Sequence, residues 1–206
     1  MSKNIFIAFE GIDGSGKSTQ VKRLARHLES AGHKVYTTCE PTEGPIGKMI
    51  RDIFNHRMEG DQRTIAALFV ADRLEHLLNK KDGILKKMEE GFTVITDRYY
   101  FSSYAYHSVH MDMDWVIEAN RLSADILRPA LNIYIDIPPE VSMSRIGKVR
   151  SSVEMYETLE NQKLVYAKYS EAMERQRKVE KIFSVAGNQQ EEKISDEVWE
   201  AVKALL

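Results

Sequence analysis

A glycine-rich segment near the beginning of the chain has the residue types that hold a nucleotide phosphate. Residues 11–18 have the sequence GIDGSGKS and fit the pattern G-x-x-x-x-G-K-[ST]. Glycines let backbone amides face phosphate oxygens, and a helix starting here would add the positive end of its dipole. Lys17 is then expected to reach the β- and γ-phosphates, and the Ser18 hydroxyl to bind Mg²⁺. The predicted loop comprises Gly11, Ile12, Asp13, Gly14, Ser15, Gly16, Lys17, Ser18 and Thr19.

Asp13 is an unusual residue for the inside of such a loop. A carboxylate beside a triphosphate is electrostatically unfavourable, so the presence of an aspartate at this position needs an explanation. One reason is that Asp13 accepts a hydrogen bond from a sugar hydroxyl of a second substrate. The alternative is a capping aspartate that faces solvent.

Asp97 closes a short segment, residues 94–97, that is expected to belong to a strand, and Arg98 follows it at once. Ligand-facing residues lie at the carboxyl ends of strands in parallel sheets. Asp97 is predicted to hold Mg²⁺, partly through water, and Arg98 to donate to phosphate oxygens. The alternative is a surface ion pair at the end of a strand.

Two further groups of cations could complete a site. Arg73 follows Phe69 by four residues on an expected helix, which places a guanidinium and an aromatic ring on one face, where they could recognise a base. The alternative is a core Phe69 with Arg73 reaching solvent. Arg145, Lys148 and Arg150 could close over a transferring phosphate, or form a solvated basic loop.

No convincing general base accompanies these residues. His107 and His110 fall in an expected loop without a third metal ligand. A phosphate monoester needs no base because its oxygens are mostly ionised at pH 7. The sequence therefore favours a nucleoside monophosphate kinase over a sugar kinase. The segment 79–82, NKKD, resembles the guanine-binding signature of nucleotide switches, but it falls in a helical stretch and is interpreted as a solvated helix face.

Strands and helices alternate along the chain, which predicts one α/β domain over residues 1–206, with a five-stranded parallel sheet between helical layers. The expected strands are residues 5–9, 35–38, 93–97, 132–137 and 182–185. The expected helices are residues 17–31, 47–54, 61–90 with a possible division at Gly83, 115–127, a segment starting near 140, 156–179 and 195–206. A short mobile lid is expected near residues 142–155, including a polar loop at 147–153.

Composition narrows the class of protein. The 206 residues carry a net charge of −2, which argues against broad binding to nucleic acid. Cys39 is the only cysteine, so no intrachain disulfide is possible. No apolar run has the length of a membrane span, and the apolar segment after Lys3 is too short for a signal peptide. We expect a cytoplasmic protein that acts away from membranes.

These residues together resemble thymidylate kinases, a family of P-loop nucleoside monophosphate kinases. The resemblance is carried by FEGIDGSGKSTQ at 9–20, FVADR at 69–73, DRY at 97–99, Arg128-Pro129 and EMYE at 154–157. It implies a P-loop NTPase fold, transfer of the γ-phosphoryl of ATP to dTMP with Mg²⁺, and a homodimer. A kinase acting on UMP or CMP is the alternative enzyme, and a non-enzymatic nucleotide switch is a more distant one.

The resemblance also implies individual roles. Phe69 would stack on thymine, Arg73 would bond its exocyclic oxygen, and Arg98 would bridge the phosphates of both substrates. Tyr106 would lie beneath the deoxyribose and crowd out a 2′-hydroxyl, and Asp13 would bind the 3′-hydroxyl. The remaining dTMP-binding residues would be Glu40, Pro41, Ser102, Ser103, Tyr156 and Glu157, while residues 186–190 would back the adenine.

Several positions depart from the family pattern. Cys39 stands where many relatives carry arginine, Met155 replaces another arginine, and Thr42-Glu43 replaces a pair of glycines. Gly14 occupies a loop position that is arginine in one branch. The resemblance therefore assigns the clamp on the transferring phosphate to the lid, with Arg145 and Arg150 as the predicted catalytic arginines beside Lys17, Asp97 and Arg98.

Overall fold

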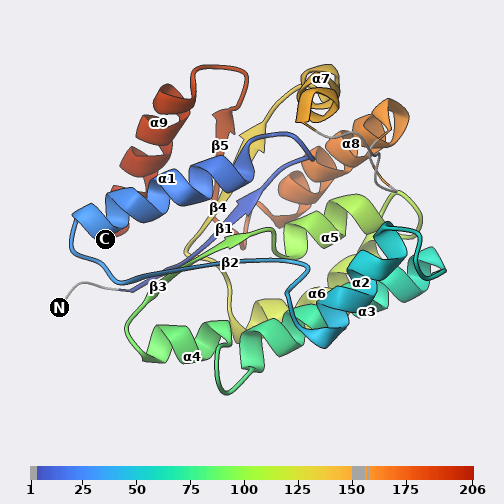
Figure 1. Ribbon diagram of the computed structural model, residues 1–206, viewed down its shortest axis with the longest axis horizontal. Coiled ribbons are helices and arrows are strands. Elements are labelled where there is room, and N and C mark those ends of the chain that lie inside the picture. Colours follow the sequence, from blue (N-terminus) through green and yellow to red (C-terminus); the bar gives the residue numbers. More distant parts are fainter. Residues whose placement is uncertain (1–3, 150–155, 157) are drawn as a thin grey trace.

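Five parallel strands form the centre of the protein (Figure 1). The computed structural model describes residues 4–149, 156 and 158–206. The strands lie in the order β2-β3-β1-β4-β5, and every neighbouring pair is parallel. Their bounds are β1 Phe6–Glu10, β2 Val35–Cys39, β3 Thr93–Asp97, β4 Leu131–Asp136 and β5 Ile182–Ala186. The predicted sheet is confirmed.

Helices cover both faces of this sheet (Figure 1). The described chain contains α1 Lys17–Ser30, α2 Pro45–Phe54, α3 Gln62–Leu78, α4 Ile84–Glu89, α5 Tyr100–His107, α6 Met113–Ile126, α7 Pro139–Val149, α8 Leu159–Gln176 and α9 Glu191–Lys203. Apolar side chains of α1 and α9 pack against one face, where Ile7 and Phe9 of β1 point. The other face, with Phe6 and Ala8, packs against α5, α6 and α8. The protein therefore has the expected three layers.

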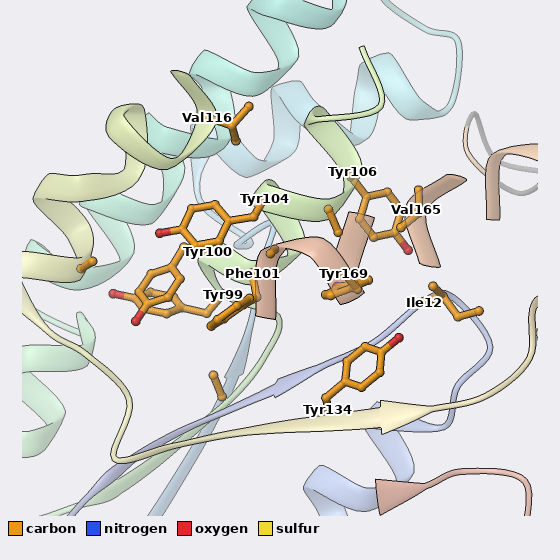
Figure 2. Packing of buried hydrophobic residues seen from close by; sticks show 14 of the residues in the cluster. Ile12, Tyr99, Tyr100, Phe101, Tyr104, Tyr106, Val116, Tyr134, Val165 and Tyr169 are labelled. Carbon is orange, nitrogen blue, oxygen red and sulfur yellow. The ribbon is translucent and has the colours of Figure 1, made fainter. Parts of the chain in front are cut away.

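The second face carries an unusually aromatic core (Figure 2). Tyr99, Tyr100 and Tyr104 are almost fully buried there, and the Tyr99 and Tyr100 ring centroids lie 4.5 Å apart. Buried tyrosines need partners for their hydroxyls. The Tyr100 hydroxyl donates to the Glu180 carboxylate at 2.7 Å, and the Tyr99 hydroxyl to the carbonyl of Leu127 at 3.1 Å. This core holds α5 firmly against the sheet.

Three expectations about helices were wrong. Residues 100–107 form α5, although the sequence indicated a loop around His107. The helical pattern expected at 61–90 divides into α3 and α4, and Gly83, the position of the possible division, is the N-cap of α4; the error lies in the segment before it. Residues 79–82 form the turn between them, stabilised by the Asn79 side chain, which accepts from the Lys81 amide at 2.9 Å, so this segment is not a helix face. The helix α7 continues to Val149, so residues 147–149 are helical rather than loop.

Within the described chain, no helix combines the length and the apolar character that crossing a membrane requires.

Candidate active site

The phosphate-binding loop connects β1 to α1, as expected. Gly11, Gly14 and Gly16 have φ angles of 142°, 71° and 98°, which side chains adopt only with strain. Their positive φ angles turn the loop back over the carboxyl end of β1. The Lys17 ammonium is buried and donates to the carbonyl oxygens of Gly11 at 3.0 Å and Ile12 at 2.9 Å. Burial, assisted by the Arg98 cation, lowers the pKa of Lys17 to about 8. An anionic ligand here would relieve that cost.

Ser18 and Asp97 meet at the mouth of this loop. Phe9 in β1 is the register partner of Asp97 in β3, so the carboxylate projects beside the start of α1. The Ser18 hydroxyl donates to Asp97 Oδ2 at 2.5 Å. A hydroxyl and a carboxylate oxygen are the ligand types that Mg²⁺ prefers. The residue pair therefore fits a magnesium site.

Arg98 occupies a strained position just after β3. Its φ of 76° lies in the left-handed region, and its backbone amide donates to the carbonyl of Phe9 at 2.9 Å. The guanidinium forms an ion pair with Asp13 and donates to the Gly11 carbonyl at 3.1 Å. This geometry directs a fixed cation between the loop and α5.

Asp13 is held by several side chains rather than facing solvent. Besides Arg98, its Oδ2 accepts from the Tyr106 hydroxyl at 2.8 Å and from the Gln162 amide at 3.3 Å. Burial alone would raise the pKa of Asp13, but the Arg98 and Lys17 cations hold it below the usual value. Asp13 is therefore an ionised hydrogen-bond acceptor.

Two cavities open on either side of this ion pair. The Phe69 cavity, of about 320 Å³, is lined by Asp13, Cys39, Glu40, Pro41, Glu43, Arg51, Phe54, Phe69, Arg98, Ser102, Ser103, Tyr106, His107 and Tyr156. The Lys17 cavity, of about 460 Å³, is lined by Asp13, Gly14, Gly16, Lys17, Ser18, Thr19, Cys39, Glu40, Asp97, Arg98, Arg145 and Ile146. Asp13, Cys39, Glu40 and Arg98 line both cavities. Ligands in the two cavities would therefore meet at these residues.

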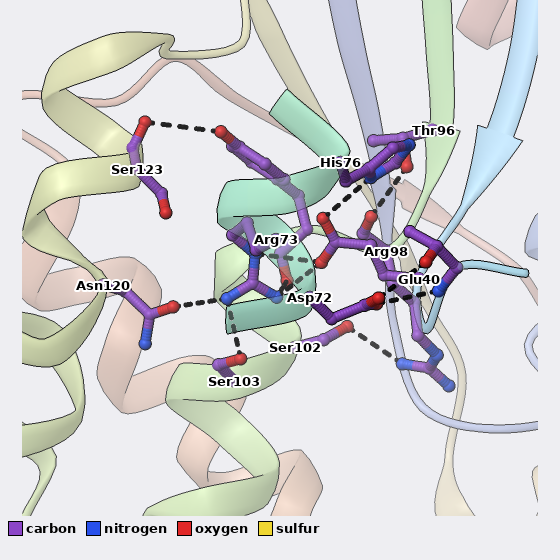
Figure 3. Close-up of polar contacts among 12 residues, drawn as sticks. Glu40, Asp72, Arg73, His76, Thr96, Arg98, Ser102, Ser103, Asn120 and Ser123 are labelled. Atoms are coloured by element: carbon purple, nitrogen blue, oxygen red, sulfur yellow. Dashed lines mark hydrogen bonds and ion pairs between the residues drawn. The ribbon is translucent and has the colours of Figure 1, made fainter. Parts of the chain in front are cut away.

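Arg73 is not among the residues that line the Phe69 cavity, and Figure 3 shows its guanidinium among Glu40, Ser103 and Asn120. Its side chain is 1% exposed. Nε and Nη2 donate to Glu40 Oε2 at 2.9 and 2.6 Å, and Nη2 also donates to the Tyr99 carbonyl at 3.1 Å. Nη1 donates to Ser103 Oγ at 3.0 Å and to Asn120 Oδ1. These contacts engage all five N–H groups of the guanidinium.

The two serines of α5 have different partners. The Ser102 hydroxyl donates to the buried Glu10 carboxylate at 2.6 Å and accepts from Arg98 Nη1 at 3.0 Å. Ser103 accepts from Arg73 instead. Ser102 is thus committed to the polar network beneath the loop, while Ser103 faces the cavity with its hydroxyl hydrogen uncommitted in the described chain.

The predicted lid residues are only partly described. Arg145 donates to the carbonyls of Ser15 at 3.3 Å and Gly187 at 2.9 Å, so it spans the phosphate loop and the segment after β5. Tyr156 lines the Phe69 cavity and donates to Gln62 Oε1 at 2.6 Å. Arg150 and Glu157, together with Glu154 and Met155, lie outside the described residues, as does the side chain of Lys148.

Sequence reasoning missed three residues of the site. Glu10 is buried at the end of β1, and burial raises its pKa to about 6. Arg51 lines the Phe69 cavity from α2 and donates to the Pro41 carbonyl at 2.9 Å. His107 lines the same cavity one helical turn after Ser103. The spacing of Ser103 and His107 would have indicated a shared face if α5 had been recognised.

Comparison with known proteins identifies a common family. The sequence model described as thymidylate kinase matches residues 9–198. The chain is 38% identical to a probable thymidylate kinase of Pyrococcus horikoshii over 192 residues, covering 89% of this chain and 91% of the relative. It is 40% identical to a probable thymidylate kinase of Methanococcus aeolicus over 167 residues, covering 81% and 78%. It is also 40% identical to the thymidylate kinase of Bacillus mycoides over 151 residues, covering 71% of each.

Proposed function

The chain belongs to the thymidylate kinase family, and from this premise we propose that it transfers the γ-phosphoryl of ATP to dTMP, forming dTDP and ADP. The observation that carries the proposal is the pair of cavities joined at Asp13 and Arg98. ATP would occupy the Lys17 cavity and dTMP the Phe69 cavity. Phosphoryl transfer depends mainly on positioning and on neutralising charge, and a shared cationic boundary provides both.

The residues of the Lys17 cavity suit a triphosphate with its metal. Backbone amides of the loop and the Lys17 ammonium would hold the phosphates. Ser18 and Asp97 would hold Mg²⁺, partly through water, and the ion would neutralise the β- and γ-phosphate oxygens. Arg145, which contacts the carbonyl of Gly187, would act at the adenosine end of ATP. Arg150, in the expected lid, would supply the cation that contacts the transferring phosphate.

The Phe69 cavity suits a pyrimidine monophosphate. Phe69 would stack on the base, and Asp13 would accept from the 3′-hydroxyl with Tyr106 beneath the sugar. Arg98 would bridge the two reacting phosphates, and Arg51 would add a second cation for the acceptor phosphate. Glu40, Pro41, Tyr156 and Glu157 would complete the enclosure. Because all N–H groups of Arg73 are engaged, this arginine would act on the base through Ser103.

The test is Mg²⁺-dependent release of ADP from ATP with dTMP, dUMP, UMP, CMP, dCMP and AMP as acceptors. We expect dTMP to give the highest kcat/KM. Equal activity on UMP or CMP would retain phosphoryl transfer but overturn the proposed base recognition. If none of these acceptors increases the release of ADP, the kinase assignment would be overturned.

We also propose that the protein is a cytoplasmic homodimer. Support for the dimer comes from exposed apolar side chains on neighbouring helices: Leu78 on α3 is 51% exposed, and Trp115 and Leu122 on α6 are 48% and 56% exposed. Single exposed apolar residues are common, but several large ones on two helices that pack against each other favour a protein partner. The cytoplasm is proposed because ATP and nucleoside monophosphates are found there; cell fractionation tests that location.

A further inference from the structure

The wall of the Phe69 cavity carries more carboxylates than guanidinium groups. Its charged lining residues are Asp13, Glu40, Glu43, Arg51 and Arg98. Each of these carboxylates already has a guanidinium partner, and the three ion pairs are Asp13–Arg98, Glu40–Arg73 and Glu43–Arg51. A phosphate monoester is mostly a dianion at pH 7. Such a ligand meets no uncommitted guanidinium in the described wall of this cavity, so its binding must disturb one of the three pairs.

The three carboxylates differ in how easily they can leave their partners. The Glu40 side chain is 1% exposed, and Asp13 accepts from the Tyr106 hydroxyl as well as from its arginine. The Glu43 side chain is 88% exposed, and Arg51, at 3.1 Å, is its only side-chain partner in the described part of the chain. An exposed ion pair contributes little free energy, because water solvates the separated charges well. Glu43 is therefore the carboxylate that an incoming anion displaces most readily.

Arg51 is held in a way that lets it exchange one anion for another. It lies on α2, where its Nη1 donates to the Pro41 carbonyl at 2.9 Å and its Nη2 donates to Glu43 Oε2 at 3.1 Å. The contact with the backbone keeps the guanidinium in the cavity wall when the carboxylate leaves. Carboxylate and phosphate oxygens are both strong acceptors for a guanidinium. Nη2 can therefore pass from Glu43 to a phosphate while Nη1 stays in place.

Resting on the proposed function, we propose that Glu43 competes with the acceptor phosphate for Arg51. The Glu43 carboxylate contacts Arg51 while the cavity is empty, and it moves into solvent when the phosphate of dTMP binds. Its return to Arg51 after phosphoryl transfer favours release of the product. Thymidine has no phosphate and need not displace it. Glu43 thus lowers the affinity of the cavity for a nucleotide relative to a nucleoside.

The experiment measures the dissociation constants of dTMP and thymidine by titration calorimetry in the wild type and in Glu43→Gln. Glutamine keeps the size of the side chain and removes its charge, so Kd for dTMP should fall about threefold to fivefold. Kd for thymidine should stay near the wild-type value. Raising the salt concentration from about 0.05 M to about 0.5 M should shrink the gain for dTMP, because salt screens exposed charges.

Glu29→Gln is the matched control for the loss of one negative charge. Glu29 is exposed near the end of α1 and lines neither cavity. Its substitution should leave Kd for dTMP unchanged. An equal fall in Glu29→Gln would show that net charge alone, rather than competition at Arg51, sets the affinity.

A double-mutant cycle separates competition for Arg51 from simple repulsion of the phosphate. Arg51→Gln removes the cation that both anions contact, so adding Glu43→Gln to this variant should give little further gain. A wild-type Kd for dTMP in Glu43→Gln, an equal fall for thymidine, or an equal gain with and without Arg51 would overturn the inference while leaving the kinase assignment intact. Wild-type protein without dTMP-dependent ADP release would instead overturn the proposed function, and this inference with it.

Discussion

Lys17 is a buried cation whose role as a phosphate ligand can be separated from its role in the fold. In Lys17→Ala we expect phosphoryl transfer to fall roughly a hundredfold to a thousandfold, because a preorganised charge is lost from the transition state. The fold should persist, since the loop glycines and backbone hold the turn. Steady-state kinetics and circular dichroism measure the two effects. Retained kcat would contradict the role assigned to Lys17.

Glu10 makes the stability of the protein depend on pH in a predictable direction. Burial raises its pKa from 4.5 to about 6, so the folded protein binds more protons than the unfolded chain between these values. Its contribution to stability is therefore fully present below pH 4.5 and falls by about 2 kcal/mol as the pH rises past 6. Glu10→Gln removes this titration. The unfolding free energy of Glu10→Gln minus that of the wild type should rise by about this amount from pH 4 to pH 7, measured by urea denaturation.

Gln62 is a suitable control for that experiment. It contacts Tyr156, which lines the Phe69 cavity, and has no charge to titrate. The unfolding free energy of Gln62→Ala minus that of the wild type should therefore not change over the same pH range. A flat difference for Glu10→Gln as well would show that the Glu10 carboxyl titrates normally in the folded protein.

Tyr106 is predicted to control the choice between deoxyribose and ribose. Tyr106→Leu should raise kcat/KM for the 2′-hydroxyl analogue of dTMP relative to dTMP, by about tenfold, because it removes the ring that crowds the 2′ position. Tyr106→Phe keeps the ring and loses only the hydroxyl that donates to Asp13, so it should leave the ratio near that of the wild type. An unchanged ratio in Tyr106→Leu would place this discrimination elsewhere.

The residues that contact phosphate were predictable from the sequence because their spacing is local. Gly11, Lys17 and Ser18 fall within one short motif, and Asp97 follows a recognisable strand. Burial of Arg73 was not predictable, since it depends on Glu40, which is 33 positions away, and on Asn120. Polar networks between distant segments leave no periodic signal in a sequence.

Among the elements, the phosphate loop and α7 are coupled at Gly14. A Cβ at this position would lie 2.9 Å from the Ser142 carbonyl and 3.0 Å from Ile146 Cγ1, on a backbone with a φ of 71°. Gly14→Ala should therefore combine left-handed strain of about 1–2 kcal/mol with a steric cost of about 1 kcal/mol. Gly16→Ala is the matched control, because its φ is 98° but nothing lies within 4 Å.

Chemical denaturation distinguishes the two glycine variants. We expect Gly14→Ala to lose more stability than Gly16→Ala, and the difference reports the contact with α7. Equal losses would show that α7 moves away from the loop without cost.

Strands that are wholly apolar and helices with one apolar face were predicted well. The helix α5 shows why an element without either pattern was missed. The segment of β1 is buried at every position, and the strand lies within one residue of the prediction. Every residue of α5 is also buried, so its sequence, YFSSYAYH, lacks the amphipathic period that identifies a surface helix. Its hydroxyls bond to side chains far away in the sequence, which cannot be inferred locally.

At the scale of the whole molecule, the sheet order places both cavities along one edge. β1 lies between β3 and β4, so the phosphate loop after β1 adjoins Asp97 and Arg98 after β3. The alternation of strands and helices predicted a parallel sheet. The sequence alone could not specify which helix faces remain exposed, and those faces decide how copies of the chain could associate.

The proposed homodimer predicts that a charge on the exposed face of α6 separates the subunits. α3 packs against α6, and the two helices lie side by side in Figure 1, so Leu78, Trp115 and Leu122 belong to neighbouring helices. Leu122→Glu would bury an unpaired carboxylate in an interface formed there, which is strongly unfavourable. Sedimentation velocity should then show a species of 23.7 kDa, where the wild type has about twice that mass.

Leu164→Glu is the matched control for this experiment, because Leu164 is a 49% exposed leucine on α8. It should remain a dimer, since Leu164 lies near the beginning of α8, whereas α8 contacts α6 near its other end, where Arg175 pairs with Asp114. Dimers in both variants would move the interface away from α6, because an exposed charge costs little where no partner covers it. A monomeric wild type would overturn the dimer itself, and the apolar side chains of α6 would then face solvent in the working protein.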